Sequence, residues 1–227
     1  MRRVKTFFIA GAGTDVGKTY VTAALARALL RTGRTVGVFK PVASGYDPAR
    51  PEESDAGRLL GALGRPLTPD NVAAICPLRF AAPLSPPAAA RREGVTLSLE
   101  SIAGLCEAEI RAAETDILLV EGVGGLMSPL TDDATGLDLM LRLKAPSVLV
   151  GGTYLGAISH LLTAAEVLKS RGLEIAVVVI SESPPPAPDF EETIADIGRF
   201  LPGLPLYAAG RVDDWRADAL AGRLVGA

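Results

Sequence analysis

One pattern recurs along most of the chain: a short, continuous apolar run followed by a segment in which apolar residues return every three or four positions. Continuous apolar runs are typical of strands buried on both faces of a parallel sheet, and the periodic segments are typical of amphipathic helices. The runs predict strands at 6–10, 35–39, 117–120, 148–150 and 175–180. The periodic segments predict a helix carrying Val21, Leu25, Ala28 and Leu29, and further helices at 55–63, 99–113, 136–143, 158–171 and 190–200.

This alternation of strand and helix predicts an α/β fold, in which one parallel sheet is covered by helices on both faces. We expect the whole chain, residues 1–227, to form a single domain of this kind. Two stretches interrupt the alternation. Residues 66–87 are rich in proline and aperiodic, so we expect a long loop over the active-site edge. Residues 183–188, with the sequence SPPPAP, predict a stiff connector, because proline continues neither strand nor helix.

Composition excludes several classes of protein. The 227 residues are 48% hydrophobic and 22% charged, which is typical of a globular domain. A net charge of −3 gives no general attraction to nucleic acid or to a lipid surface, and we expect neither as a partner. The first residues lack a secretory signal, and glycine and polar residues interrupt the apolar stretch 145–168, so a cytoplasmic location is expected. Cys76 and Cys106 have no metal-ligand spacing and are interpreted as reduced thiols.

The most informative motif is GAGTDVGKT, Gly11 to Thr19, between the first strand and the first helix. In such a loop the backbone N–H groups and the helix dipole face a triphosphate, Lys18 reaches the outer phosphate oxygens, and the Thr19 hydroxyl binds Mg²⁺. Five residues separate Gly11 from Gly17, where the standard motif has four. An ordinary glycine-rich turn is the alternative. The nucleotide-binding candidates are Gly13, Thr14, Asp15, Val16, Gly17, Lys18, Thr19 and Tyr20.

Two further motifs follow predicted strands, at the sheet edge where ligands bind in such folds. KPVASG, beginning at Lys40, follows the second strand, and EGVGG, beginning at Glu121, ends the central one. Asp55 lies between them in the sequence. Because Mg²⁺ prefers hard oxygen ligands, Thr19, Asp55 and Glu121 form a sensible ligand set. Each residue also has a structural alternative, since Lys40 could be solvated or ion-paired, Asp55 could cap a helix and Glu121 could make an internal ion pair.

These motifs resemble those of the dethiobiotin synthetase family, which carries GTDTxVGKT, KPVxSG and VEGxGG at corresponding places. Fainter similarities are Ala82 to Pro86, which resembles a substrate-side loop of the family, and LGAISH, Leu155 to His160, which resembles its LGxINH segment. The resemblance extends over nearly the whole chain. It implies a P-loop NTPase-like fold and the ATP- and Mg²⁺-dependent closure of 7,8-diaminononanoate with CO₂ to dethiobiotin, ADP and phosphate.

The resemblance also implies roles for individual residues. Lys18 and Lys40 become catalytic cations, and replacing Lys40 by Ala is expected to lower turnover by about 10² to 10³ with little effect on folding. It implies a homodimer in which the helix start after LGxINH receives the substrate carboxylate from the partner subunit. The implied substrate contacts are Thr14, Ser44, Pro83, Gly156, Ala157 and Ser159. The implied nucleotide contacts, besides the phosphate loop, are Asp55, Glu121, Gly122, Val123, Gly124, Ser181, Gly210, Arg211 and Val212.

The chain departs from the family pattern at the expected base site and substrate tail. Ile180 and Ser181 stand where the family often has an adenine-reading Asn. Tyr154 stands where the family often has Lys or Asp, and Ser159 stands where it has Asn. Strong discrimination between bases needs buried hydrogen-bonding groups. We therefore expect backbone groups near Ser181 and residues 210–212 to read the base only weakly.

Two other functions fit parts of the sequence. A relative of the cobyrinic acid amide synthases shares the extended loop but needs a glutaminase domain, for which 227 residues leave no room. A partitioning-type ATPase switch uses an early Lys in a KGGxGKT loop, whereas this chain has Ala12 and Gly13 there.

Overall fold

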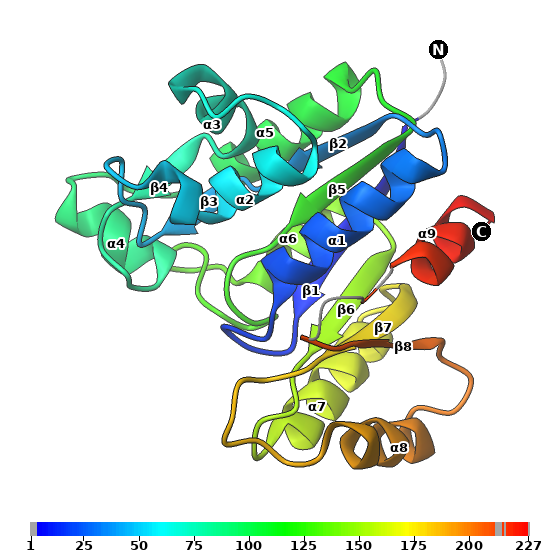
Figure 1. Ribbon diagram of the computed structural model, residues 1–227. Helices are drawn as coiled ribbons and strands as arrows, with labels where there is room; N and C mark the ends of the chain where they lie inside the picture. The colour runs from blue at the N-terminus through cyan, green and yellow to red at the C-terminus, as the bar shows by residue number, and fades with distance from the viewer. Residues whose placement is uncertain (1–3, 212–214, 216, 227) are drawn as a thin grey trace.

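The structure is a computed structural model that describes residues 4–211, 215 and 217–226. Within these residues a six-stranded sheet has the order β2-β5-β1-β6-β7-β8, and all of its strand pairs are parallel (Figure 1). Its strands are β1 (Lys5–Gly11), β2 (Val36–Phe39), β5 (Ile117–Glu121), β6 (Ser147–Gly151), β7 (Ile175–Ser181) and β8 (Leu206–Ala209). A second, two-stranded parallel sheet pairs β3 (Val42–Ser44) with β4 (Leu78–Phe80). The α/β class and the parallel sheet are confirmed.

Helices lie on both sides of the main sheet (Figure 1). On one side lies the helix that follows the phosphate loop, α1 (Lys18–Arg31), together with α2 (Asp55–Ala62), α3 (Pro69–Ile75) and α9 (Asp218–Gly226). Those on the opposite side are α4 (Pro86–Arg92), α5 (Leu99–Ala112), α6 (Gly136–Leu143), α7 (Ala157–Ser170) and α8 (Phe190–Phe200). A short 3₁₀ helix, η1 (Pro51–Glu53), precedes α2.

The apolar strands divide their side chains between two cores. Alternate residues of a strand point to opposite faces, so Phe7 and Ile9 of β1 pack with α1 while Phe8 and Ala10 pack with α6 and α7. All four side chains are at most 3% exposed. Continuous apolar runs are therefore required here, because neither face of the sheet is left to water.

The prediction of a structureless loop at 66–87 was wrong. This stretch contains α3 and β4, and α4 begins within it at Pro86. Thr68 accepts a hydrogen bond from the Asn71 N–H, and Pro69 occupies the first turn of α3, where its missing N–H costs nothing. Helices α3 and α4 are too short to show a periodic apolar pattern in the sequence. The prolines that suggested a loop lie in the first turns of these two helices. The connector at 183–188 is free of helix and strand, as expected.

The order of strands places the expected motifs together. From β1 the chain passes over the position of β5 to the edge strand β2 and later returns to β5, which lies between β1 and β2. After β5 it crosses β1 to reach β6 on the other side of β1. Ligand crevices of open parallel sheets form at such reversals, beyond the carboxyl ends of the strands. The phosphate loop follows β1, and Glu121 is the last residue of β5, directly beside it in the sheet.

Candidate phosphate and metal site

The phosphate loop joins β1 to α1 through a backbone that only glycine fits at one position. Gly17 has φ 90° and caps α1. A Cβ added to Gly17 would lie 2.4 Å from Ser181 Oγ, so any side chain here is excluded by both conformation and space. Asp15 also lies in the left-handed region, with φ 56°. The predicted order of strand, loop and helix is confirmed, and the first N–H groups of a helix have no partner within the helix itself.

Lys18 lies in the first turn of α1 and is buried with the loop. Its Nζ donates to the Gly13 carbonyl oxygen at 3.3 Å, and the residue is 7% exposed. Burial lowers the pKa of Lys18 to about 8, with a further lowering from the Lys40 charge that Glu121 and Asp55 oppose in part. A buried ammonium without a carboxylate partner in the described residues is poised to gain from an anion.

Thr19, Asp55 and Glu121 converge although they are far apart in the sequence. Thr19 Oγ1 lies 2.9 Å from Asp55 Oδ1 and 2.6 Å from Glu121 Oε1. Its single hydroxyl proton serves one of these oxygens at a time. Glu121 is fully buried, and its Oε2 has no hydrogen-bond partner among the described residues. The three residues that the sequence nominated as Mg²⁺ ligands are thus brought together.

Lys40 completes this cluster as a buried ion pair. Its Nζ lies 2.7 Å from Glu121 Oε1 and 2.9 Å from Asp55 Oδ2, and its side chain is 3% exposed. Burial alone would lower the pKa of Lys40, but the Glu121 and Asp55 carboxylates outweigh burial and hold the pKa above its ordinary value. The same ammonium keeps the pKa of Asp55 below its usual range despite burial. Removing Lys40 would leave the buried Glu121 carboxylate and the partly exposed Asp55 carboxylate without their cation, so we now expect its replacement to lower stability as well as turnover, in place of the expectation that folding barely changes.

The donor set fits Mg²⁺. Adjacent corners of an octahedron with Mg–O distances of 2.0–2.1 Å are about 2.9 Å apart, close to the two separations around Thr19 Oγ1. Hard oxygens from one hydroxyl and two carboxylates match the ion's preference, and the unpartnered Glu121 Oε2 leaves a lone pair for a further bond. Within the described residues no group of three or more His, Cys, Asp or Glu side chains could hold a metal, so a purely acidic site is not formed.

A cavity of about 280 Å³, here called the phosphate pocket, opens beside this cluster. Most of its lining residues were expected from sequence, but Arg58 and Ala43 were missed. Arg58 follows Asp55 by one helical turn, a spacing that could have signalled it. The lining is Thr14, Asp15, Gly17, Lys18, Thr19, Tyr20, Lys40, Ala43, Ser44, Asp55, Arg58, Val123, Gly124 and Arg211.

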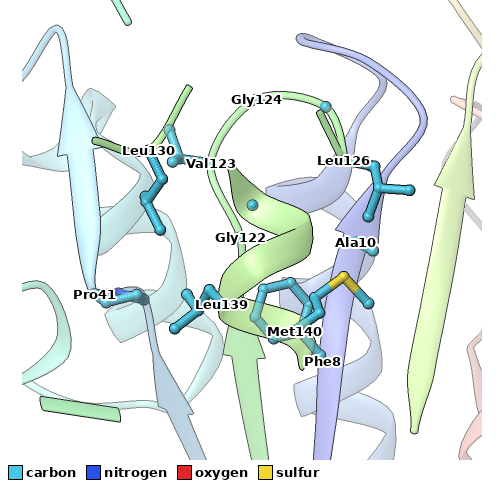
Figure 2. Close-up of a pocket in the computed structure, with 13 residues that line it drawn as sticks. Phe8, Ala10, Pro41, Gly122, Val123, Gly124, Leu126, Leu130, Leu139 and Met140 are labelled. Carbon is cyan, nitrogen blue, oxygen red and sulfur yellow. The ribbon is translucent and has the colours of Figure 1, made fainter. Parts of the chain in front are cut away.

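The loop after Glu121 lines both the phosphate pocket and a small apolar cavity of about 20 Å³, and Figure 2 shows the second of these. Figure 2 shows Phe8, Leu139 and Met140 gathered on one side of Gly122, below it in this view. A Cβ on Gly122 would lie 3.0 Å from Phe8 Cε1, so glycine allows the loop to pack against β1 at this point. Val123 and Gly124 line both cavities. The glycines of EGVGG thus bring backbone close to the pocket, as expected.

Tyr20 and Arg211, which both line the pocket, contact each other and the chain around them. The Tyr20 hydroxyl donates to the Gly210 carbonyl oxygen at 2.6 Å, and the Arg211 guanidinium lies 4.7 Å from the Tyr20 ring centre. Arg211 Nε donates to the Glu182 carbonyl oxygen at 2.8 Å. Ser181 Oγ is buried without a hydrogen-bond partner in the described part of the chain. Val212, another expected base contact, lies outside the described residues.

The remaining expected substrate residues do not line the phosphate pocket of their own chain. Pro83 lies against Gly45, where an added Cβ would approach it to 3.4 Å. Gly156 caps α7 and Ala157 begins that helix. Gly156 and Ser159 line a separate groove with Tyr154, Leu155 and Phe200, of which Leu155 is 90% exposed.

The fold and phosphate loop define the class of protein to which the chain belongs: the P-loop nucleotide-binding α/β proteins. A family described as an AAA domain matches residues 5–210. Solved structures with the same fold include hydrogenase maturation factor HypB from Archaeoglobus fulgidus (TM-score 0.55, 14% identity, covering 99% of this chain and 90% of that one) and a ParA family ATPase from Chlorobium tepidum TLS (TM-score 0.53, 16% identity, 98% and 89%). At these identities they show the fold alone.

Sequence relatives define the family more narrowly. ATP-dependent dethiobiotin synthetase BioD of Phenylobacterium zucineum (strain HLK1) is 53% identical over 206 residues, covering 90% of this chain and 88% of the relative. The protein of the same name from Caulobacter vibrioides (strain NA1000 / CB15N) is 46% identical over 222 residues, covering 98% and 100%. The chain belongs to the dethiobiotin synthetase family.

Two expectations of a different kind concern membranes and thiols. Among the described residues no helix has both the length and the apolar character needed to cross a membrane. Cys76 and Cys106 are free, fully buried thiols, as expected. Burial raises the pKa of each to about 12, so neither is a reactive thiolate near neutral pH.

Proposed function

We propose that the chain catalyses the ATP-dependent ring closure of 7,8-diaminononanoate with CO₂, which gives dethiobiotin, ADP and phosphate in biotin biosynthesis. One observation supports this most: two buried lysines and a hydroxyl–carboxylate cluster meet at one pocket in a chain that belongs to the dethiobiotin synthetase family. The pocket's lining, which contains neither Cys nor His among the described residues, fits a reaction without a protein nucleophile.

The reaction proposed has three steps. One substrate amine adds to CO₂ and loses a proton, which forms a carbamate. A carbamate oxygen then attacks the γ-phosphorus of ATP, forming an O–P bond as the bond to ADP breaks. The second amine attacks the carbamoyl carbon, closes the cyclic urea and expels phosphate with the carbamate oxygen. Catalysis of such transfers depends mainly on positioning and on neutralising charge.

Lys18 and Lys40 supply that neutralisation from different sides. Lys18 lies within the phosphate loop, and an incoming γ-phosphate would replace the Gly13 carbonyl as its partner. Lys40 is fixed by two carboxylates at 2.7 and 2.9 Å, so its ammonium is held in place before the substrate arrives. Fixed donors of this kind need no reorganisation when charge moves to the carbamate and phosphoryl oxygens. Ser44, at the end of β3, contributes a hydroxyl to the same pocket.

Thr19, Asp55 and Glu121 would hold Mg²⁺, which when bound neutralises charge on the β- and γ-phosphates. The residues around them keep the set in place. The Ser54 hydroxyl caps α2 by accepting from the Gly57 N–H at 3.0 Å, and this fixes Asp55 at the first helical position.

We also propose a homodimer that completes the substrate site. The groove at the start of α7 exposes Leu155 and Phe200, at 90% and 65%, and apolar side chains so exposed are typical of surfaces that another protein covers. Donors at the start of α7 would receive the substrate carboxylate from the partner. Sedimentation or light scattering should give twice the mass of one chain, and a Leu155→Asp variant should be monomeric. A monomeric wild-type protein at assay concentration would contradict this arrangement.

The experiment that tests the function is product analysis. The folded protein is incubated with 7,8-diaminononanoate, bicarbonate and Mg-ATP, and dethiobiotin is measured by mass spectrometry. ATP turnover is followed with and without each co-substrate. We expect dethiobiotin, and ATP turnover that depends on both co-substrates. An ATPase switch would hydrolyse ATP at the same rate without them.

A further inference from the structure

Arg58 is one of four cationic side chains that line the phosphate pocket, with Lys18 of the phosphate loop, Lys40 and Arg211. It lines the pocket with Lys40, Ser44 and Asp55. Its exposed side chain makes no hydrogen bond or ion pair with any other described residue. Asp55, three positions earlier on α2, is already occupied by Lys40 and Thr19. A guanidinium beside an anion site but without a carboxylate partner has its donors free for an incoming ligand.

The start of α2 fixes where this side chain can reach. A Cβ on Gly57 would lie 2.1 Å from the Pro51 carbonyl oxygen, so η1 packs directly against the first turn of α2. Leu59 and Leu60, on the inner side, are fully buried in the core with α1. Residues three apart share a helix face, and long side chains lean toward the helix N-terminus. The Arg58 side chain therefore extends from a rigid base toward Asp55 and the pocket.

Charge balance indicates what Arg58 binds. Lys40 is matched by Asp55 and Glu121, and Arg211 is held by the Glu182 carbonyl and the Tyr20 ring. The reacting ligands bring excess negative charge, because a carbamate joins a triphosphate that one divalent ion only partly neutralises. Arginine offers several donors in a planar fork that suits phosphoryl oxygens, whereas Lys offers a point charge.

We propose that Arg58 binds the phosphoryl group that is transferred from ATP, and holds it until it is released as inorganic phosphate. This inference rests on the proposed function for its reaction, but phosphate binding can be measured without turnover. The site is distinct from the phosphate loop, which keeps the phosphates of ADP when the transferred group has moved to the side of Lys40 and Ser44.

The test compares Arg58→Ala and Arg58→Lys with Arg27→Ala, a matched control on an exposed arginine of α1 that does not line the pocket. The full chain, saturated with Mg-ADP, is titrated with inorganic phosphate in a calorimeter at fixed ionic strength. We expect Arg58→Ala to weaken phosphate binding about tenfold, Arg58→Lys to weaken it less, and Arg27→Ala to match wild type. Because Arg58 is exposed and unpartnered, thermal midpoints should not change.

Turnover gives a second readout. Arg58→Ala should lower kcat about tenfold and raise the inhibition constant for phosphate by a similar factor, with the KM for diaminononanoate within twofold of wild type. If Arg58→Ala binds phosphate as wild type does, or raises only the KM for the diamine, the assignment is wrong. A wild-type protein that makes no dethiobiotin would refute the proposed function, while the phosphate titration would still decide the role of Arg58.

Discussion

Replacing Lys40 by Ala should damage both folding and catalysis, because the ammonium is buried between two carboxylates. Lys40 is 3% exposed and Glu121 is fully buried, so solvent screens this pair little. Removing one partner of a buried pair costs about 3–5 kcal/mol, chiefly through the charge left behind. Against a typical free energy of unfolding of about 5–15 kcal/mol this is a large fraction. Losing one fixed donor to developing charge should lower kcat by about 10² to 10³.

A double-mutant cycle separates these effects. Urea unfolding at pH 7 without nucleotide would compare wild type, Lys40→Ala, Glu121→Gln and the double variant, with Lys169→Ala as an exposed control. Neutralising Glu121 in the Lys40→Ala background removes the unpaired charge. The double variant should therefore be more stable than Lys40→Ala, with a coupling free energy of about 2 kcal/mol or more. A Lys40→Ala protein within about 0.5 kcal/mol of wild type, or strictly additive variants, would show that Lys40 and Glu121 do not form a stabilising buried pair.

Three further predictions follow from the site and the core. Glu121→Gln should raise the Mg²⁺ concentration needed for half-maximal turnover, and an unchanged Mg²⁺ titration with unchanged kcat would show that Glu121 is not a ligand. The kcat/KM values for ATP, GTP and CTP should lie within about 10³ of one another, since a larger preference requires about 4 kcal/mol of selective contacts near Ser181. Folding raises the pKa of Cys106 from 9.0 to about 12, so above pH 9 the unfolded state loses a proton that the folded state keeps. Stability from this thiol is complete below pH 9 and falls by about 1.4 kcal/mol per pH unit as pH rises toward 12. The stability difference between wild type and Cys106→Ala, measured by urea unfolding at pH 8, 9 and 10, should shrink accordingly, and a difference independent of pH would contradict the shift.

The main sheet could be predicted from sequence because each buried strand is a continuous apolar run. The same pattern fails for short elements at the rim. Residues 42–44 form β3 directly after Lys40 and Pro41, and 78–80 form β4, but three residues carry no periodicity. The strand 206–209 and the helix 218–226 were also not predicted. Their local sequences are mixed, and only packing against the rest of the fold selects their conformation.

The site could be predicted as a set of motifs but not as a set of contacts. Each motif follows a strand whose place in the sheet brings it to the crevice, which is why Thr19, Asp55 and Glu121 meet. Lys40 is buried as the ion-pair partner of Asp55 and Glu121, and this depends on distances in the folded protein that the spacing of residues along the chain does not reveal. Arg58 was missed because a single helical arginine is normally a solvated surface residue, and only the position of α2 turns it toward the pocket.

Ring closure through a phosphorylated carbamate leaves a distinctive pattern of oxygen transfer, which isotope labelling can follow. Bicarbonate labelled with ¹⁸O is supplied with diaminononanoate and Mg-ATP, and the reaction is stopped before the bicarbonate exchanges its label with water. The ¹⁸O content of dethiobiotin and of phosphate is then measured by mass spectrometry. We expect dethiobiotin that keeps one labelled oxygen in its urea carbonyl, and an equal amount of phosphate that carries one labelled oxygen from the carbamate. Unlabelled phosphate, or phosphate released without dethiobiotin, would contradict it.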